Sequence, residues 1–393
     1  MKRGFAFEGG GAKGAYHIGV AKAFFEKGYE FDGFVGTSIG AVNAAVLAQG
    51  DFDKALELWQ NISPDDIFTD EDKPLLQFAD LKDIELNADF ISEVKVALSK
   101  VIGSKGISTE KMLAFLNRYI DEDKLRASGK DFGLVTVSLT ERKPYQLMLK
   151  DIPQGKLVAY IMASASLPVF SAVTIDGKKF LDGAFYNNCP VNLLDSQGYD
   201  EIIAVRVGSR GFVFSNIDKM KNVKLISAKE DLGSMMLFSA EVSTENIKYG
   251  YFDARRFIEK LRGFDYYITP IDTELFDAKL MNLDHLVLSE LGKILKISNT
   301  FGKRMLFEKA IPMLGSHIGL HKGFDYADFI IALLERKATQ MQIERLKIYE
   351  YDELRSLTKV HDSKQAKKPK KLLTNPLTLK NDTAIELLMR HLL

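Results

Sequence analysis

The stretch Phe34-Val35-Gly36-Thr37-Ser38-Ile39-Gly40-Ala41-Val42-Asn43-Ala44-Ala45 holds a Gly-x-Ser-x-Gly pentapeptide between an apolar run and an alanine-rich run. That pattern is typical of a nucleophile elbow, a sharp strand-to-helix turn that exposes the serine hydroxyl. Glycines two residues before and after the serine let strand and helix approach closely. The stretch therefore predicts Ser38 as a nucleophile, with the backbone N–H of Ile39 and the positive end of the helix facing an oxyanion. Taken alone, the pentapeptide also fits a Gly/Ser turn without a catalytic role.

The composition limits the class of protein. The 393 residues suffice for one large domain and a smaller one. With 53 basic and 53 acidic residues, the chain has no net attraction to nucleic acid. The single cysteine, Cys189, excludes an intramolecular disulfide and a cysteine-rich zinc site. We find neither the apolar core of a signal peptide nor an apolar run of membrane-spanning length, so we expect a cytoplasmic protein.

A glycine-rich loop, residues 9–14, follows a predicted buried strand at 4–8 and precedes a predicted helix at 15–27. A dinucleotide site is one interpretation, but Asp32 stands at the start of the second strand, where such a site needs its acid at the end. A phosphate-binding loop fails because the last glycine is not followed by Lys and then Ser or Thr. An oxyanion hole fits, because consecutive glycine N–H groups form an anion-binding concavity. Lys13 either adds charge to this site or is simply solvated.

The motifs resemble, in their order, those of the bacterial-type patatin-like phospholipases over residues 4–270. That family has Gly-Gly-Gly-x-Lys-Gly, then Gly-x-Ser-x-Gly, then an aspartate in Asp-Gly-Gly or Asp-Gly-Ala. Here the third motif is Asp182-Gly183-Ala184, and the segment 163–170 upstream and Asn188 downstream also fit. The resemblance implies a Ser-Asp dyad in which Ser38 is the nucleophile and Asp182 the general base. It also implies an oxyanion hole from Gly9, Gly10, Gly11 and Ile39, with Lys13, Gly14, Gly36, Gly40, Gly183 and Ala184 as motif positions.

The role of Asp182 can also be argued from its neighbours in the sequence, apart from the resemblance to the family. An Asp-Gly pair is usually a turn, and Asp176-Gly177 predicts one that closes a hairpin over 173–181. Asp182 differs because it follows the apolar pair Phe180-Leu181. A carboxylate at the end of a buried strand needs a partner.

We expect an α/β fold: a three-layer α/β/α catalytic domain with a mostly parallel central sheet at 1–273, and a helical C-terminal region at 274–393. Within the first domain, 64–130 reads as a helical insertion, either a lid over the site or a packed accessory layer. Residues 364–371 form a basic run that predicts an exposed linker. The final helix, 381–393, has one apolar face, which either docks on the body or lies on a membrane surface. The other expected elements are helices at 41–62, 155–166 and 240–261 and strands at 132–140, 145–150 and 202–208.

We expect hydrolysis of phospholipids or other lipid esters, without a metal or cofactor and with no nucleic-acid partner. A first alternative is a lipase effector regulated by a protein partner. A second is a non-catalytic protein that keeps the scaffold. A third is an α/β-hydrolase-like esterase with a Ser-Asp-His triad. For that triad the chain offers five histidines after Asp182, but only one strand precedes Ser38 and these histidines lie in the helical tail. They are His285, His317, His321, His361 and His391.

Overall fold

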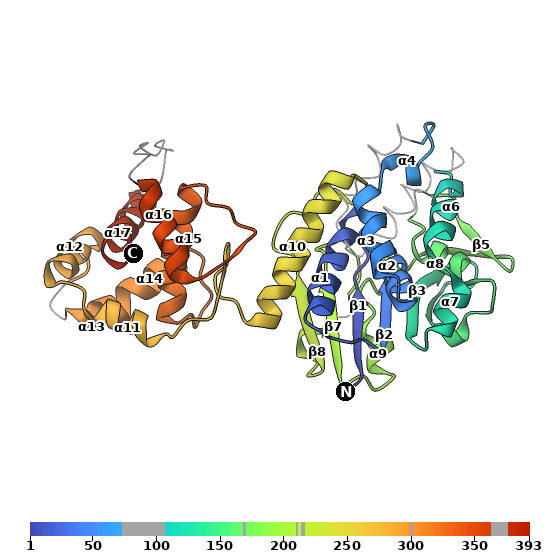
Figure 1. The fold of residues 1–393 in the computed structure, drawn as a ribbon, viewed down its shortest axis with the longest axis horizontal. Coiled ribbons are helices and arrows are strands. Elements are labelled where there is room, and N and C mark those ends of the chain that lie inside the picture. Colours follow the sequence, from blue (N-terminus) through green and yellow to red (C-terminus); the bar gives the residue numbers. More distant parts are fainter. Residues whose placement is uncertain (73–106, 168–169, 210, 214–216, 299–301, 363–375) are drawn as a thin grey trace. The chain divides into compact units, whose positions relative to one another are not determined.

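The computed structural model describes residues 1–72, 107–167, 170–209, 211–213, 217–298, 302–362 and 376–393 (Figure 1). The chain divides into two compact units, Met1–Arg255 and Arg256–Leu393. The division falls inside helix α10 (Ala240–Glu259). The boundary between the two compact units therefore lies between Arg255 and Arg256, before residue 273. The functional division into 1–273 and 274–393 stays a prediction.

Unit 1, Met1–Arg255, is built on an eight-stranded sheet. Five neighbouring strands run parallel. In sheet order they are β3 (Asp131–Ser138), β2 (Gly33–Thr37), β1 (Arg3–Phe7), β7 (Glu201–Arg206) and β8 (Val223–Ser227). Three strands pair antiparallel beyond β3: β4 (Lys143–Met148), β6 (Lys178–Asp182) and β5 (Val173–Ile175). The expected mostly parallel α/β sheet is confirmed.

Successive side chains of each strand point to opposite faces of this sheet, and helices pack against both faces. On one face, Phe5 of β1 stacks on Phe31 at 3.9 Å and meets the edge of Phe24 on α1 (Ala15–Glu26) at 5.5 Å. On the other face, Ala6 belongs to a buried cluster with Leu194 of α9 (Val191–Asp195). Helix α10 crosses α1 so closely that a Cβ at Gly19 would lie 1.9 Å from the carbonyl oxygen of Ile247. The sheet is thus the middle of three layers.

The prediction of one helix at 41–62 is wrong, because two helices occupy this range. Helix α2 (Ile39–Ala48) ends before Gly50, and α3 (Phe52–Asn61) begins two residues later. Gly50 has a φ of 83°, and its N–H bonds to the carbonyl of Leu47. A glycine in the left-handed region is a usual helix stop, so this residue ends α2 and turns the chain.

The predicted hairpin at 173–181 is confirmed: β5 and β6 pair around Asp176 and Gly177, which both have positive φ. Helix α8 (Leu157–Ser164) precedes this hairpin. The described parts of the expected insertion at 64–130 are α4 (Pro64–Ile67), α6 (Glu110–Tyr119) and α7 (Glu122–Ala127). Residues 73–106 lie outside the described residues. Short 3₁₀ turns are formed by Gly11–Gly14, Leu149–Asp151, Gly183–Phe185 and Ile217–Lys219.

Unit 2, Arg256–Leu393, is mainly helical and has its own buried core. Its elements are α11 (Glu274–Met281), α12 (His285–Leu295), α13 (Lys303–Met305), a π-helical turn (Leu306–Ala310), α14 (Ile311–His317), α15 (Tyr326–Gln340), α16 (Tyr351–Asp362), α17 (Pro376–Leu392) and the paired strands β9 (Tyr267–Ile268) and β10 (Ile348–Tyr349).

The final helix docks on unit 2. Ile385, Leu388 and Leu392 of α17 belong to the core cluster of this unit. Helix α17 begins five residues before the expected start at 381. The basic run at 364–371 lies outside the described residues. In the part of the chain that the structure describes, no helix has both the length and the apolar character needed to cross a membrane.

Candidate active site

Ser38 lies at a sharp turn between β2 and α2, with φ 56° and ψ −129°. A non-glycine residue in such a conformation costs about 1–3 kcal/mol and persists only where its surroundings enforce it. The flanking glycines allow the tight approach. A Cβ at Gly36 would lie 2.2 Å from the carbonyl carbon of Gly40, and one at Gly40 would lie 2.5 Å from the carbonyl oxygen of Phe7. The backbone thus has the geometry expected of a nucleophile elbow.

Asp182 is the last residue of β6 and is fully buried. Its Oδ1 accepts a hydrogen bond of 2.8 Å from the N–H of Ala184. Its Oδ2 makes no hydrogen bond of standard geometry within the described residues, although the Ser38 side chain interacts with the carboxylate. Burial raises the pKa of Asp182 to about 7, against the lowering effects of the Ala184 N–H and the Ser38 hydroxyl. Near neutral pH this carboxyl can therefore both accept and return a proton.

Strand pairing brings the nucleophile and the acid together. Strand β2, which leads into Ser38, pairs parallel with β3, and β3 pairs antiparallel with β6 so that Thr136 lies opposite Asp182. Both side chains thus lie at the carboxyl edge of β2 and β3. In open α/β sheets this edge is where ligands bind.

The glycine loop lies beside the elbow and is held on one side. The N–H of Gly9 donates to the carbonyl of Asn188 at 3.0 Å and to its side-chain oxygen at 3.2 Å. The N–H groups of Gly10, Gly11 and Ile39 carry no hydrogen bond in the described part of the chain. Gly9 therefore anchors the loop, and the other three N–H groups remain available to a ligand.

Lys13 and the glycines Gly14 and Gly183 of the motifs are in close contact with neighbouring parts of unit 1. Lys13 is half-buried, and its N–H donates to the carbonyl of Gly10 at 3.2 Å. A Cβ at Gly14 would lie 2.8 Å from the indole of Trp59, and one at Gly183 would lie 2.1 Å from the carbonyl oxygen of Val135. These two glycines are thus needed for close packing at the start of α1 and at the end of β6.

An ion pair with a buried carboxylate, which the motifs did not indicate, lies directly before the glycine loop. Glu8 is fully buried, and its carboxylate accepts from the Arg206 side chain at 3.0 Å and from the N–H of Val207 at 2.7 Å. Burial raises the pKa of the Glu8 carboxyl, and Arg206 opposes that shift. The pair ties the end of β1 to the end of β7, and so fixes the base of the loop. The sequence did carry a signal for this ion pair, because Glu8 is an acidic residue between an apolar strand and a run of glycines.

A small apolar cavity opens beside Ser38. Its volume is about 40 Å³, and Gly11, Ser38 and Ile39 are among the residues that line it. The rest of the lining is apolar, and includes Val42, Ile62, Met112, Phe115, Leu116 and Phe238. A cavity of this size holds roughly one water-sized group. Its chemistry suits an alkyl chain better than a polar one.

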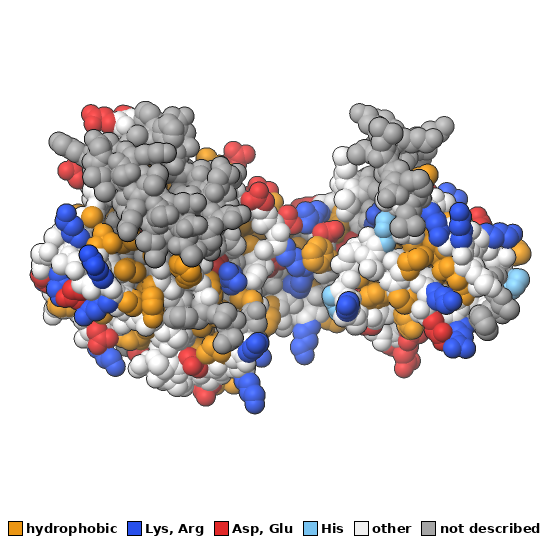
Figure 2. All heavy atoms as spheres, turned by 180° about the vertical axis from the view of Figure 1, so that it is seen from behind, with side chains coloured by type: hydrophobic (Ala, Val, Ile, Leu, Met, Phe, Trp, Pro, Cys, Tyr) orange, Lys and Arg blue, Asp and Glu red, His pale blue; other side chains and the backbone are white. Residues whose placement is uncertain are grey.

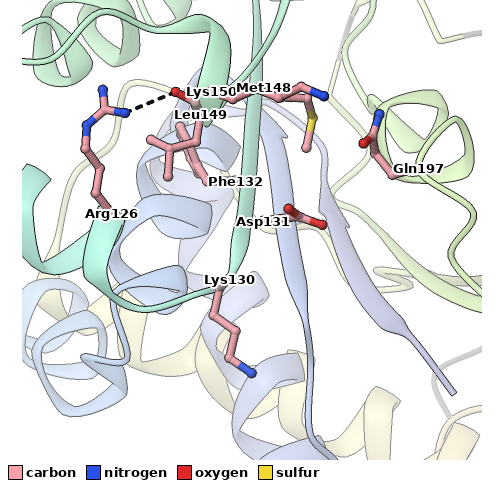
Figure 3. A pocket seen from close by; sticks show the side chains of 8 residues that line it. All are labelled: Arg126, Lys130, Asp131, Phe132, Met148, Leu149, Lys150 and Gln197. Atoms are coloured by element: carbon pink, nitrogen blue, oxygen red, sulfur yellow. Dashed lines mark hydrogen bonds between the residues drawn. The ribbon is translucent and has the colours of Figure 1, made fainter.

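A second cavity, of about 300 Å³, lies at the start of β3, at the opposite edge of the sheet from Asp182. Figure 3 shows Arg126 reaching across to the carbonyl oxygen of Leu149, to which it donates at 3.3 Å. Asp131 accepts from the ammonium of Lys2 at 2.9 Å and from the hydroxyl of Tyr199 at 2.8 Å. Two of the charged groups that line this cavity are therefore already engaged by the protein.

Unit 1 contains one histidine, His17, and it is buried in α1. Its Nδ1 lies 3.2 Å from the side-chain amide of Asn43, and its ring stacks on Phe7 at 4.9 Å. Burial lowers the pKa of His17 to about 3. His285, His317, His321 and His391 belong to unit 2, and the side chain of His361 lies outside the described residues. Among the described residues, no three His, Cys, Asp or Glu side chains cluster as metal ligands would.

Residues 5–195 match the family model for patatin-like phospholipases. The matched range contains the glycine loop, the Ser38 elbow and Asp182. The chain carries a patatin-like phospholipase domain. This domain lies within unit 1 and includes both groups of the expected dyad.

Curated relatives of the patatin-like domain share about a quarter of its residues. Patatin-like phospholipase domain-containing protein 7 of Rattus norvegicus is 25% identical over 51% of this chain and 13% of its own length. Lysophospholipase NTE1 of Yarrowia lipolytica is 27% identical over 52% of this chain and 13% of its own length. An uncharacterized NTE family protein of Mycobacterium bovis is 27% identical over 51% of this chain and 47% of its own length. The chain thus spans less than half the length of each of these relatives.

Solved structures resemble the chain more distantly. VipD from Legionella pneumophila is 14% identical, with a TM-score of 0.42 over 99% of this chain and 91% of that one. The type III effector ExoU is 15% identical, with a TM-score of 0.35 over 99% of this chain and 80% of that one.

Proposed function

We propose that unit 1 hydrolyses carboxylic esters of lipids, either phospholipids or other acyl lipids, with Ser38 as nucleophile and Asp182 as general base. The observation that carries the proposal is a serine at a strained elbow whose side chain interacts with a buried carboxyl of near-neutral pKa. An aspartate of ordinary acidity would be a weak base at neutral pH. Burial removes that weakness here.

In the first step, the Ser38 hydroxyl attacks the ester carbonyl carbon while Asp182 takes its proton. The carbonyl oxygen becomes an oxyanion, and the N–H groups of Gly10, Gly11 and Ile39 are its proposed donors. The intermediate collapses as the C–O bond to the alcohol breaks, and Asp182 returns its proton to that oxygen. The products are a free alcohol and an acyl ester on Ser38.

The second step repeats the chemistry with water. Asp182 takes a proton from a water molecule, whose oxygen attacks the acyl carbon, and the same N–H groups stabilise the second oxyanion. Collapse of this intermediate releases a fatty acid and returns the proton to Ser38. One carboxyl thus acts twice, as base and as acid, which a pKa of about 7 suits.

The apolar cavity beside Ser38 supports a lipid substrate. Met112, Phe115 and Leu116 of α6 and Val42 of α2 line it, so an acyl chain that enters this cavity would meet alkyl and aromatic groups. The relative Lysophospholipase NTE1 bears a name that fits the same substrate class. A dyad is favoured over a triad because His17, the histidine of unit 1, hydrogen-bonds Asn43 and is neutral at working pH.

Peripheral contact with a lipid surface is part of this proposal. The basic run at 364–371 would supply the charge. Figure 2 shows lysine and arginine side chains interspersed with hydrophobic ones on the visible face of unit 2. The apolar face of α17 takes no part, because Ile385 and Leu388 are buried in the core of that unit.

Active-site labelling tests the proposed function. A fluorophosphonate probe should label the wild-type protein and leave Ser38→Ala unlabelled, and the wild type alone should release fatty acid from a mixed lipid extract read by mass spectrometry. Ser243→Ala is the matched control, because Ser243 is a buried serine of α10 whose hydroxyl has no hydrogen-bond partner within the described residues. Equal labelling of Ser38→Ala and wild type would overturn the assignment of the nucleophile.

A further inference from the structure

The segment 163–170 is a sequence motif to which the proposed mechanism gives no role. Ser164 is the last residue of α8 and is fully buried. Its Oγ accepts a hydrogen bond of 3.0 Å from the backbone N–H of Ser38. The same hydroxyl donates to the carbonyl oxygen of Val135 on β3 at 2.6 Å.

The direction of these two bonds is fixed by chemistry. A serine hydroxyl has one hydrogen to donate, and Val135 takes it because a backbone carbonyl can only accept. The Ser164 oxygen therefore faces the N–H of Ser38 as an acceptor. Ser38 needs such a partner, because its backbone lies in a sparsely populated conformation that the surroundings must enforce.

The segment 163–170 also contacts the backbone of Asp182. Two residues beyond Ser164, the carbonyl of Ser166 accepts a hydrogen bond of 2.9 Å from the backbone N–H of Asp182. The end of α8 thus fixes the main chain of both proposed catalytic residues, which come from different strands. The N–H of Ser38 is also taken out of the set of donors that an oxyanion could use.

We propose that Ser164 is a positioning residue: its hydroxyl holds the backbone of Ser38 so that the nucleophile's side chain stays directed at Asp182. This inference rests on the proposed function. Ser164 touches neither substrate nor the reacting atoms, so it acts only through the placement of Ser38. A misplacement of about 1 Å at a reacting group can cost 10²-fold in rate.

The test compares Ser164→Ala with Ser164→Thr on a soluble p-nitrophenyl ester. Ser164→Ala should lower kcat by about 10- to 100-fold while KM changes by less than about 2-fold. Ser164→Thr keeps the hydroxyl and should recover most of kcat. Ser138→Ala is the matched control, because Ser138 is a fully buried serine of β3 whose hydroxyl accepts from the N–H of Glu141 in a turn. It should lose stability without losing kcat.

A pH profile separates positioning from a general loss of stability. The Ser38 hydroxyl lowers the pKa of Asp182, so a displaced Ser38 should move the acid limb of the Ser164→Ala profile to higher pH. Ser138→Ala should leave that limb in place. If Ser164→Ala does not fold by circular dichroism, Ser164→Cys, which has similar size and a weaker donor and acceptor, takes its place with the same expected signs.

Failure of this inference and failure of the proposed function give different results. An active wild type with unchanged kcat and an unchanged acid limb in Ser164→Ala overturns the positioning role and leaves the function standing. A rise in KM alone also overturns it. A wild type that neither cleaves esters nor reacts with fluorophosphonate overturns the proposed function, and the positioning role with it.

Discussion

Gly11 lies directly against the backbone of Met235: a Cβ at Gly11 would stand 2.1 Å from the Met235 carbonyl oxygen. That oxygen accepts a hydrogen bond of 2.8 Å from the N–H of Ala12. The next residues of the same segment, including Met236 and Phe238, line the apolar cavity beside Ser38. One segment of chain therefore both supports the glycine loop and shapes the proposed acyl site.

Replacing Gly11 by alanine should therefore disable the site. The added methyl group would push the loop away from Met235 and displace at least one N–H of the proposed oxyanion hole, which costs roughly 10²–10³ in kcat. The measurement is kcat on a soluble ester, with the melting temperature beside it. Gly28→Ala is the matched control: Gly28 also has positive φ, at 77°, but has open space where a Cβ would go. It should lose a little stability and no kcat. Equal kcat in Gly11→Ala and wild type would contradict the loop assignment.

Asp182→Asn should lose activity and gain stability. The rate should fall by about 10²–10⁴, the usual contribution of a general base. Burial raises the pKa of Asp182 from 3.8 to about 7, so the folded state holds this proton more tightly than the unfolded state. The stabilisation from proton binding is present at acid pH and is lost as pH rises towards 7. The neutral asparagine has no charge to bury, so Asp182→Asn should unfold at a higher temperature than wild type at pH 8.

The stability difference should also depend on pH in a defined direction. It should shrink between pH 8 and pH 5 as the wild-type carboxyl takes up its proton, from an upper limit of about 4 kcal/mol. Asp123→Asn, at an exposed carboxylate on α7, is the control for the loss of one negative charge. A melting-temperature difference between Asp182→Asn and wild type that grows on acidification would contradict a raised pKa at Asp182.

A dyad predicts that the histidines of unit 2 are dispensable. The triple replacement of His285, His317 and His321 by asparagine should leave kcat/KM within about 3-fold of wild type, far from the loss that follows removal of a general base. Some stability should be lost, because His317 lies 3.3 Å from the carboxylate of Asp382. The measurement is kcat/KM on the soluble ester. A loss that matches that of Asp182→Asn would instead favour the Ser-Asp-His triad.

The sequence predicted the features that short motifs determine. The turn at Ser38, the hairpin at Asp176 and Gly177 and the mostly parallel sheet all follow from local glycine positions and strand-helix alternation. The stop at Gly50 was missed because apolar spacing continues from α2 into α3 across one glycine.

Long-range contacts could not be read from the sequence. Ser164 reaches the N–H of Ser38 across 126 positions, and Glu8 reaches Arg206 across 198. A serine and a glutamate are ordinary residues until folding places a partner beside them. The cavity beside Ser38 was equally hidden, because its walls come from α2, α6 and the segment near Phe238.

The narrow cavity predicts which residue limits acyl length. At about 40 Å³ it accepts a longer chain only if a lining side chain moves or is removed. Met112 on α6 is an unbranched, adaptable side chain in that lining. Met112→Ala should raise kcat/KM for p-nitrophenyl esters of eight or more carbons relative to the butyrate, by about 3- to 10-fold, on the scale of one or two buried methylene groups. Leu113→Ala, at an exposed neighbour on the same helix, should leave the ratio unchanged. An unchanged ratio in Met112→Ala would place the acyl chain elsewhere.

The basic run at 364–371 predicts salt-dependent binding to anionic vesicles. Truncation would be a poor test, because α17 follows the run and its Ile385 and Leu388 belong to the core of unit 2. Replacing the five lysines of the run by glutamine keeps that helix. Each lysine near an anionic surface contributes about 1 kcal/mol at most, and salt screens it. The variant without these five lysines should therefore co-sediment less than wild type with phosphatidylserine vesicles at low salt. The difference in bound protein between variant and wild type should vanish at high salt. Replacing five exposed lysines of unit 1 by glutamine is the control for total charge. If both variants lose binding equally, the net charge of the protein directs the contact and this run does not. If neither variant loses binding, the run has no role at the lipid surface.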